Sequence, residues 1–186
     1  NGLSIEDMPS VLDFGCGCGR VLRNLSFLYK QSRWHGCDAN ATPLVWCKQA
    51  LPAIEFVYNE GQGVMPYETN SMHLIYALSV FSHLDEGALS FWLGELHRIL
   101  VPGGHFLMTI LGTAYLHALS SEERNRFAAG EPVVQGLQNL GENGCAAYYP
   151  KSYVLSVTAP HFKLVDHIPG GAVGNGHQDL YLLQKS

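Results

Sequence analysis

The segment from Val11 to Arg20, Val-Leu-Asp-Phe-Gly-Cys-Gly-Cys-Gly-Arg, constrains the fold more than any other part of the chain. A short apolar run reaches Asp13, and Gly15, Gly17 and Gly19 then alternate with other residues before a helix-like pattern begins. Glycines between a strand and a helix let backbone N–H groups and the helix N-terminus approach a ligand closely. The segment therefore predicts a nucleotide-type pocket at the carboxyl end of a first strand.

The remaining elements predict an α/β fold. Strands are expected at 10–14, 34–37, 54–58, 72–77, 105–110, 162–168 and 179–184, and helices at 19–30, 42–51, 85–100, from 120 onward and at 149–159. A glycine-rich turn at 169–176, without a helix, joins the last two strands, so the final strand should be antiparallel. We expect a Rossmann-like, doubly wound seven-stranded sheet in three α/β/α layers, mostly parallel with an antiparallel last strand.

The length of 186 residues predicts a single domain, 1–186. An insertion at about 111–152, rich in glycine and without regular periodicity, is expected to form the substrate side. The chain begins at Asn1 rather than Met, and its first strand starts about ten residues later. We therefore expect a truncated N-terminus.

Composition narrows the classes of partner. The formal net charge of −5 gives no electrostatic attraction toward nucleic acid. The five cysteines are odd in number and irregularly spaced, which favours reduced thiols in a cytoplasmic protein over a disulfide framework or a metal site. No apolar run is long enough to span a membrane, and no signal peptide is visible. The oligomeric state stays open.

The glycine motif differs from the dinucleotide fingerprint, because Arg20 occupies the register of its third glycine. Asp38 ends the second predicted strand, where a carboxylate can accept hydrogen bonds from both hydroxyls of a ribose. Three alternatives stay open at this point: a nicotinamide-dependent oxidoreductase, glycines that serve only a tight packing turn, and Asp38 as a helix N-cap.

Four segments together resemble the class I S-adenosylmethionine-dependent methyltransferases: 11–20, Gly36-Cys37-Asp38, 71–84, and Leu-Val-Pro-Gly-Gly-His-Phe at 100–106. The resemblance implies S-adenosylmethionine as cofactor and S-adenosylhomocysteine as product. It places Asp13, Gly15, Cys16, Gly17 and Gly19 around the methionine part of the cofactor, Asp38 at the ribose, Ala39, Asn59 and Glu60 at the adenine, and Ala77, Leu78 and Ser79 near the sulfonium.

The same resemblance limits the acceptor. The Asn/Asp-Pro-Pro-Tyr/Phe motif of enzymes that methylate base amino groups is absent after the fourth strand, where Ala77-Leu78-Ser79-Val80 stands. No cysteine follows a proline, as the cytosine-C5 enzymes require, and no carboxylate cluster predicts a metal. We expect a small-molecule acceptor that is methylated on oxygen.

An oxygen acceptor usually needs a general base, most often histidine. His83 and His177 are the candidates, although each could instead be structural. A non-catalytic S-adenosylmethionine-binding module of a larger protein is the alternative function.

Overall fold

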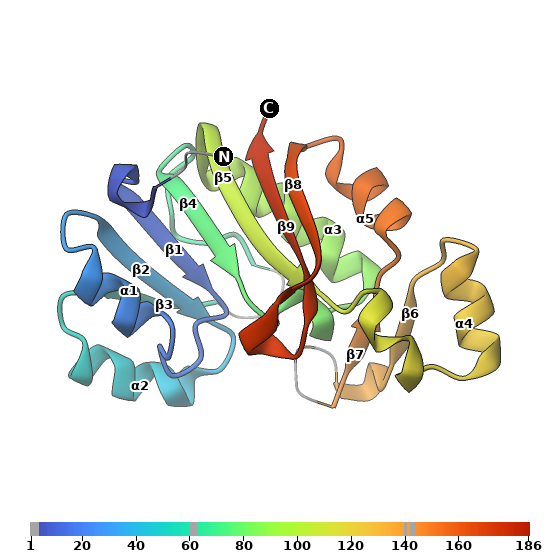
Figure 1. The fold of residues 1–186 in the computed structure, drawn as a ribbon. Coiled ribbons are helices and arrows are strands. Elements are labelled where there is room, and N and C mark those ends of the chain that lie inside the picture. The colour runs from blue at the N-terminus through green and yellow to red at the C-terminus, as the bar shows by residue number, and fades with distance from the viewer. Residues whose placement is uncertain (1–3, 60–62, 140, 142–143) are drawn as a thin grey trace.

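A computed structural model describes residues 4–59, 63–139, 141 and 144–186. Figure 1 shows one layer of strands between two layers of helices, as the sequence predicts. The main sheet contains β1 (Ser10–Phe14), β2 (Arg33–Asp38), β3 (Glu55–Tyr58), β4 (Met72–Ala77), β5 (Leu100–Ile110), β8 (Phe162–Ala172) and β9 (Gln178–Lys185). The helices are α1 (Leu22–Leu28), α2 (Ala41–Ala50), α3 (Glu86–Ile99), α4 (Ser121–Ala128) and α5 (Lys151–Thr158). Among the described helices, none is long and apolar enough to cross a membrane.

The seven strands follow the order β3-β2-β1-β4-β5-β9-β8. β1 pairs in parallel with both β2 and β4, and β9 is antiparallel to β5 and β8. The predicted antiparallel last strand is therefore confirmed. The chain runs outward from β1 to β3 and then returns to β4 on the other side of β1, which makes the carboxyl ends of β1 and β4 the switch point of the sheet.

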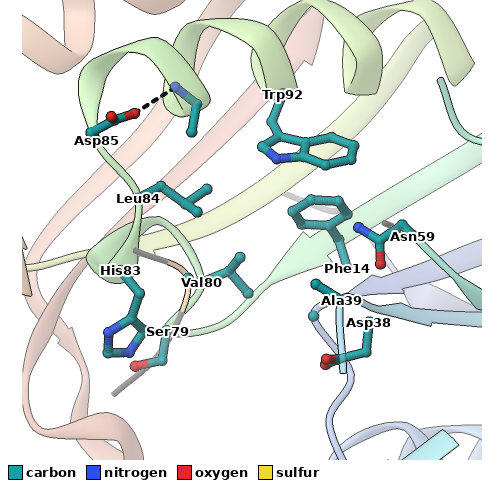
Figure 2. A pocket seen from close by; sticks show the side chains of 13 residues that line it. Phe14, Asp38, Ala39, Asn59, Ser79, Val80, His83, Leu84, Asp85 and Trp92 are labelled. Atoms are coloured by element: carbon teal, nitrogen blue, oxygen red, sulfur yellow. Dashed lines mark hydrogen bonds between the residues drawn. The ribbon is translucent and has the colours of Figure 1, made fainter. Parts of the chain in front are cut away.

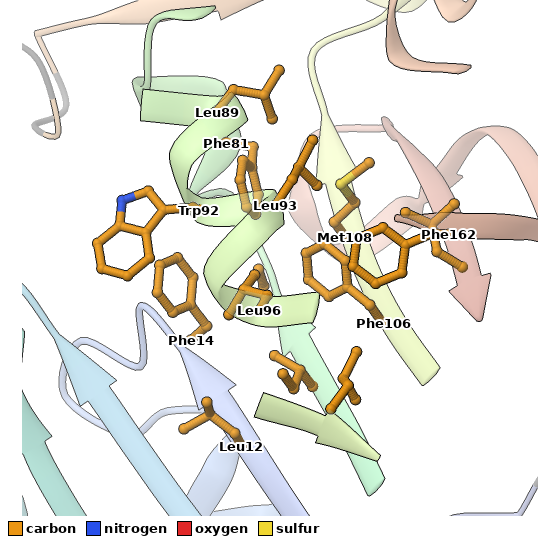
Figure 3. Packing of buried hydrophobic residues seen from close by; sticks show 14 of the residues in the cluster. Leu12, Phe14, Phe81, Leu89, Trp92, Leu93, Leu96, Phe106, Met108 and Phe162 are labelled. Atoms are coloured by element: carbon orange, nitrogen blue, oxygen red, sulfur yellow. The ribbon is translucent and has the colours of Figure 1, made fainter. Parts of the chain in front are cut away.

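Alternating side chains of β1 enter two hydrophobic cores on opposite faces of the sheet. Leu12 and Phe14 pack with α3 and α5, whereas Val11 packs with α1 and α2. Figure 3 shows the first core, in which Trp92, Leu93 and neighbouring residues of α3 meet the strands. All five β1 residues are buried, as expected for a central parallel strand covered by helices on both faces.

Polar caps define the starts of three helices. Asp85 Oδ1 accepts from the backbone N of Ala88 at the start of α3. Ser120 and Glu123 form the reciprocal capping box that the sequence predicts for α4. Asn40 caps α2, so this helix begins at Ala41, and Pro43 is its third residue rather than its first.

Two strands, β5 and β8, extend well beyond the expected bounds, whereas β2, β3 and β9 differ from them by no more than one residue at either end. β5 begins at Leu100, and the predicted Pro-Gly-Gly turn lies inside it as an irregularity, because the pairing passes from Met72–Leu100 to Leu74–His105. β8 likewise continues to Ala172 through a second irregularity. Glycines allow the backbone to bulge without ending the strand, which sequence periodicity alone does not distinguish from a turn.

The expected insertion contains more regular structure than its sequence predicts. β6 (Val133–Gln135) and β7 (Ala146–Tyr148) form a separate antiparallel pair. Phe127 of α4 packs against Val133 and Tyr148 of this pair in a small third core. Strands of three residues between glycines carry too little periodic pattern to be recognised from sequence.

Candidate functional site

A cavity of about 510 Å³ opens at the switch point of the sheet (Figure 2). Ligand sites of open α/β sheets lie at this position, and the volume lies within the range of small-molecule pockets. The cavity is lined by Phe14, Gly15, Asp38, Ala39, Asn59, Ser79, Val80, His83, Leu84, Asp85, Ala88, Trp92 and Gly141. Six of the residues predicted from the sequence are thus brought together: Gly15, Asp38, Ala39, Asn59, Ser79 and His83.

The glycine turn after β1 is held against β2 beside the cavity. Gly15, Gly17 and Gly19 all have positive φ, at 78°, 52° and 67°. The backbone N–H groups of Gly15 and Cys16 both donate to the carbonyl of Cys37, at 2.9 Å, which ties the turn to β2. A Cβ atom added to Gly15 would overlap the side chain of Val80, whereas one added to Gly17 would meet nothing within 4 Å.

Gly15→Ala is therefore expected to destabilise the protein by about 1–3 kcal/mol more than Gly17→Ala, because only the first adds overpacking to the cost of positive φ. Urea unfolding of the two variants measures the difference. Val80→Ala, combined with Gly15→Ala, should recover part of the loss. Equal destabilisation by the two alanines would contradict the close approach of Val80 to the turn.

Asp38 connects the glycine turn to the start of α2. Its Oδ2 accepts from the backbone N of Gly17 at 2.7 Å, and its Oδ1 accepts from the backbone N of Asn40 at 2.8 Å. The N-cap alternative for Asp38 is wrong, because the Asn40 side chain caps α2 by accepting from Thr42. A carboxylate has about four lone-pair sites, so Asp38 retains acceptor capacity toward the cavity.

Asp13 lies beneath the glycine turn with 4% of its surface exposed, and it does not line this cavity. Burial raises the pKa of its carboxyl to about 7; the nearby Tyr76 hydroxyl lowers it and Asp38 raises it further. The folded protein therefore keeps the Asp13 proton at pH values where the unfolded chain has lost it.

This shift predicts how stability depends on pH. The contribution of protonated Asp13 to the stability of the folded protein is fully present below its ordinary pKa of 3.8. This contribution is lost as the pH rises toward about 7. Relative to Asp13→Asn, which carries no titrating proton, the free energy of unfolding of the wild-type protein should fall over this window, by at most about 1.4 kcal/mol per pH unit. Urea unfolding of both proteins at several pH values checks the prediction; a constant difference between them would contradict it.

Asn59 follows β3 and places an unpaired acceptor at the cavity. Only 9% of the residue is exposed, its backbone N donates to the Asp38 carbonyl at 3.1 Å, and its side-chain Oδ1 is buried without a hydrogen-bond partner among the described residues. Buried acceptors normally have partners, so this oxygen indicates a position where a ligand donor belongs. Glu60, the other residue predicted here, lies outside the described residues.

The apolar wall of the cavity is a feature that the sequence does not predict. Phe14 meets Trp92 edge-to-face, with ring centroids 4.8 Å apart, and Val80, Leu84 and Ala88 continue this wall. Both aromatic residues match ordinary core patterns, and nothing in their spacing separates a cavity wall from a packed core. Asp85 and Gly141 complete the lining that was not predicted.

His83 ends the short 3-10 helix Phe81–His83 and lines the cavity on the same side as Ser79 (Figure 2). Its Nδ1 lies 2.7 Å from the carbonyl oxygen of Cys145, and its own carbonyl accepts from the backbone N of Gly141 at 2.8 Å. Gly141 thus holds the backbone of His83, and Cys145 holds its ring. A carbonyl oxygen can only accept, so Nδ1 carries the hydrogen and Nε2 of the neutral ring is an acceptor.

The other predicted site residues lie outside the lining formed by the described residues. Cys16 and Leu78 are each next in the chain to a lining residue, Gly15 and Ser79, whereas Gly17, Gly19 and Ala77 are not. His177 is exposed in the turn between β8 and β9, at φ +60°. The structure therefore brings one of the two candidate bases, His83, to the cavity. Among the described residues, no group of three or more His, Cys, Asp or Glu side chains could hold a metal ion.

A family profile described as "Methyltransferase domain" matches residues 11–104, which is half of the chain. This segment runs from β1 through β4, the cavity-lining residues that follow it and those of α3, into β5. The finding excludes the nicotinamide-dependent oxidoreductase alternative.

Curated relatives match about half of the chain. The trans-aconitate 2-methyltransferase of Azoarcus sp. is 34% identical over 100 residues, which cover 54% of this chain and 38% of that protein. The fatty-acid O-methyltransferase of Mycolicibacterium smegmatis is 29% identical over 101 residues, which cover 53% of this chain and 36% of that protein. The matched region thus spans less than two fifths of these relatives.

Solved structures extend the likeness to nearly the whole fold. An S-adenosylmethionine-dependent methyltransferase from Mesorhizobium loti has a TM-score of 0.72 at 15% identity, covering 95% of this chain and 90% of its own. At this identity the likeness concerns the fold. Together with the family match and the geometry of the cavity, it leads to one conclusion: the chain belongs to the methyltransferase domain family and has the fold of its class I, S-adenosylmethionine-dependent members.

Proposed function

We propose that this single domain transfers a methyl group from S-adenosylmethionine to a hydroxyl oxygen of a small molecule, with His83 as the general base. The observation that carries the proposal is the hydrogen bond between His83 Nδ1 and the carbonyl of Cys145, at 2.7 Å. It leaves Nε2 as the ring nitrogen that is free of that carbonyl, on a residue that lines the cavity. In its neutral form, an imidazole fixed in this way is suited to accept a proton from an incoming hydroxyl through Nε2.

The residues present fit the cofactor. The Asp38 carboxylate retains lone pairs for two ribose hydroxyls, and the buried, unpaired Oδ1 of Asn59 could accept from the adenine amino group. Gly15 brings the backbone to the cavity wall without a side chain. The aromatic rings of Phe14 and Trp92 give the cavity an apolar wall, against which a planar ring such as adenine could pack. We also propose that Ala39 and Glu60 border the adenine, as the resemblance implies.

The bound cofactor supplies a sulfonium methyl group for an in-line displacement. The chain's own residues supply alignment, exclusion of water and proton transfer. His83 Nε2 accepts the hydroxyl proton as the oxygen attacks, while its Nδ1–H stays bonded to Cys145 and stabilises the resulting imidazolium. His177, exposed in its turn, has no part in this scheme.

The acceptor side is assigned to the segment at 111–152. It carries β6, β7 and α4, and its Gly141 and Cys145 hold His83. The curated relatives are named for trans-aconitate and for fatty acids, which supports a small-molecule acceptor. The net charge of −5 favours such an acceptor over nucleic acid, and five free cysteines fit a reducing compartment such as the cytoplasm.

Titration calorimetry with S-adenosylmethionine and S-adenosylhomocysteine tests the cofactor site, with micromolar affinity expected, about −7 to −8 kcal/mol. A panel of hydroxylated small molecules, assayed for transfer of a labelled methyl group, then tests the reaction. Product methylated on nitrogen or carbon would overturn the oxygen assignment. Binding without transfer to any alcohol, phenol, amine or carboxylate would favour a non-catalytic binding module.

A further inference from the structure

Ser79 holds an unusual backbone conformation at the edge of the cavity. It lies two residues after the end of β4 and has φ +61°, a region that residues other than glycine rarely adopt. Such a conformation costs free energy and persists only where neighbouring groups hold it. Of the described non-glycine residues with positive φ, Asn70, Ser79 and His177, only Ser79 lines the cavity.

A closed ring of three hydrogen bonds surrounds Ser79. Its backbone N donates to Thr109 Oγ1 at 2.8 Å, the Thr109 hydroxyl donates to Gln178 Oε1 at 2.6 Å, and Gln178 Nε2 donates to Ser79 Oγ at 2.7 Å. Thr109 is fully buried and Gln178 is 4% exposed. The ring joins the ends of β4, β5 and β9, and its outer partners are 99 residues apart in the chain.

We propose that Gln178 is a positioning residue of the methyltransferase site, which holds Ser79 in its left-handed conformation and so fixes the cavity wall at the end of β4. Its amide is suited to this task, because the oxygen accepts from Thr109 while the nitrogen donates to Ser79. Gln178 does not line the cavity and acts through Ser79. This inference rests on the proposed function and on the position near the sulfonium that the resemblance to class I methyltransferases implies for Ser79.

Gln178→Met tests the proposal, since methionine keeps the length of the side chain without these two hydrogen bonds. We expect S-adenosylhomocysteine to bind about tenfold more weakly, because the strained serine relaxes and moves the wall. Glycine adopts positive φ at little cost, so in a Ser79→Gly background the same substitution should weaken binding by about twofold or less. A role in packing alone would give the same loss in both backgrounds.

Gln184→Met is the matched control. Gln184 lies on the same strand, and its Nε2 donates to the Gly103 carbonyl at 3.1 Å, outside the cavity lining. This substitution should leave the affinity unchanged. If Gln178→Met does not fold, Thr109→Val, which removes both hydrogen bonds of the Thr109 hydroxyl, replaces it in the same comparison.

Urea unfolding of four proteins separates this inference from the proposed function: the wild type, Gln178→Met, Ser79→Gly and the double variant. Failure of the wild-type protein to bind S-adenosylhomocysteine would overturn the proposed function. The positioning role would still be tested, because Gln178→Met should destabilise the serine protein more than the Ser79→Gly protein without any ligand. Purely additive effects on stability and on affinity would overturn the role of Gln178.

Discussion

Replacement of His83 by alanine is expected to lower the turnover rate by about 10²–10⁴-fold, the usual contribution of a positioned general base. The affinity for S-adenosylhomocysteine should change by about threefold or less, because the proton that His83 accepts belongs to the acceptor and not to the cofactor. The measurements are steady-state kinetics with a hydroxylated acceptor and titration calorimetry with S-adenosylhomocysteine. The effect should therefore fall on kcat, with cofactor binding retained.

A second variant separates the chemical role of His83 from its structural role. His83→Asn retains an N–H donor that can reach the Cys145 carbonyl, so Gly141 and Cys145 should stay in place, but an amide is not a general base. Activity that asparagine restores would show that His83 only supports these two residues. His117→Ala is the matched control, since its Nδ1 lies 3.0 Å from the Ala114 carbonyl, and the residue is exposed outside the cavity lining.

The sequence predicts the parts of this site that depend on local pattern. Gly15, Gly17 and Gly19 follow a buried strand, and Asp38 ends the next one, so their place at the carboxyl edge of a parallel sheet follows from chain direction alone. The antiparallel last strand is equally local, because a turn without a helix can join only antiparallel neighbours.

The parts that the sequence does not predict depend on pairs that are distant in the chain. His83 and Cys145 are 62 residues apart, and Ser79 and Gln178 are 99 apart. No periodicity connects such residues, and the elements between them include strands too short to recognise. The sequence favours His177 over the adjacent Gln178, because histidine suggests chemistry by its residue type, whereas a glutamine becomes important only through the partners that folding gives it.

Replacement of Asp38 by alanine is expected to weaken S-adenosylhomocysteine binding by about 100-fold or more. The variant loses a charged acceptor for the ribose hydroxyls, and hydrogen bonds to charged groups contribute about 1.5–3 kcal/mol each. It also leaves the backbone N of Gly17 without its 2.7 Å partner, which loosens the glycine turn. Calorimetric titration of the wild-type and variant proteins measures the loss directly.

Asp38→Asn and Asn40→Ala show which property of Asp38 is responsible. Both carboxylate oxygens accept from backbone N–H groups, of Gly17 and of Asn40, so an amide would place its own donor against one of them, and the asparagine variant should bind nearly as weakly as alanine. Asn40→Ala removes the cap of α2, at a cost of about 1 kcal/mol in stability, but keeps the carboxylate and should retain affinity. A large loss in Asn40→Ala with little loss in Asp38→Asn would assign the effect to the start of α2 rather than to the charge that faces the cavity.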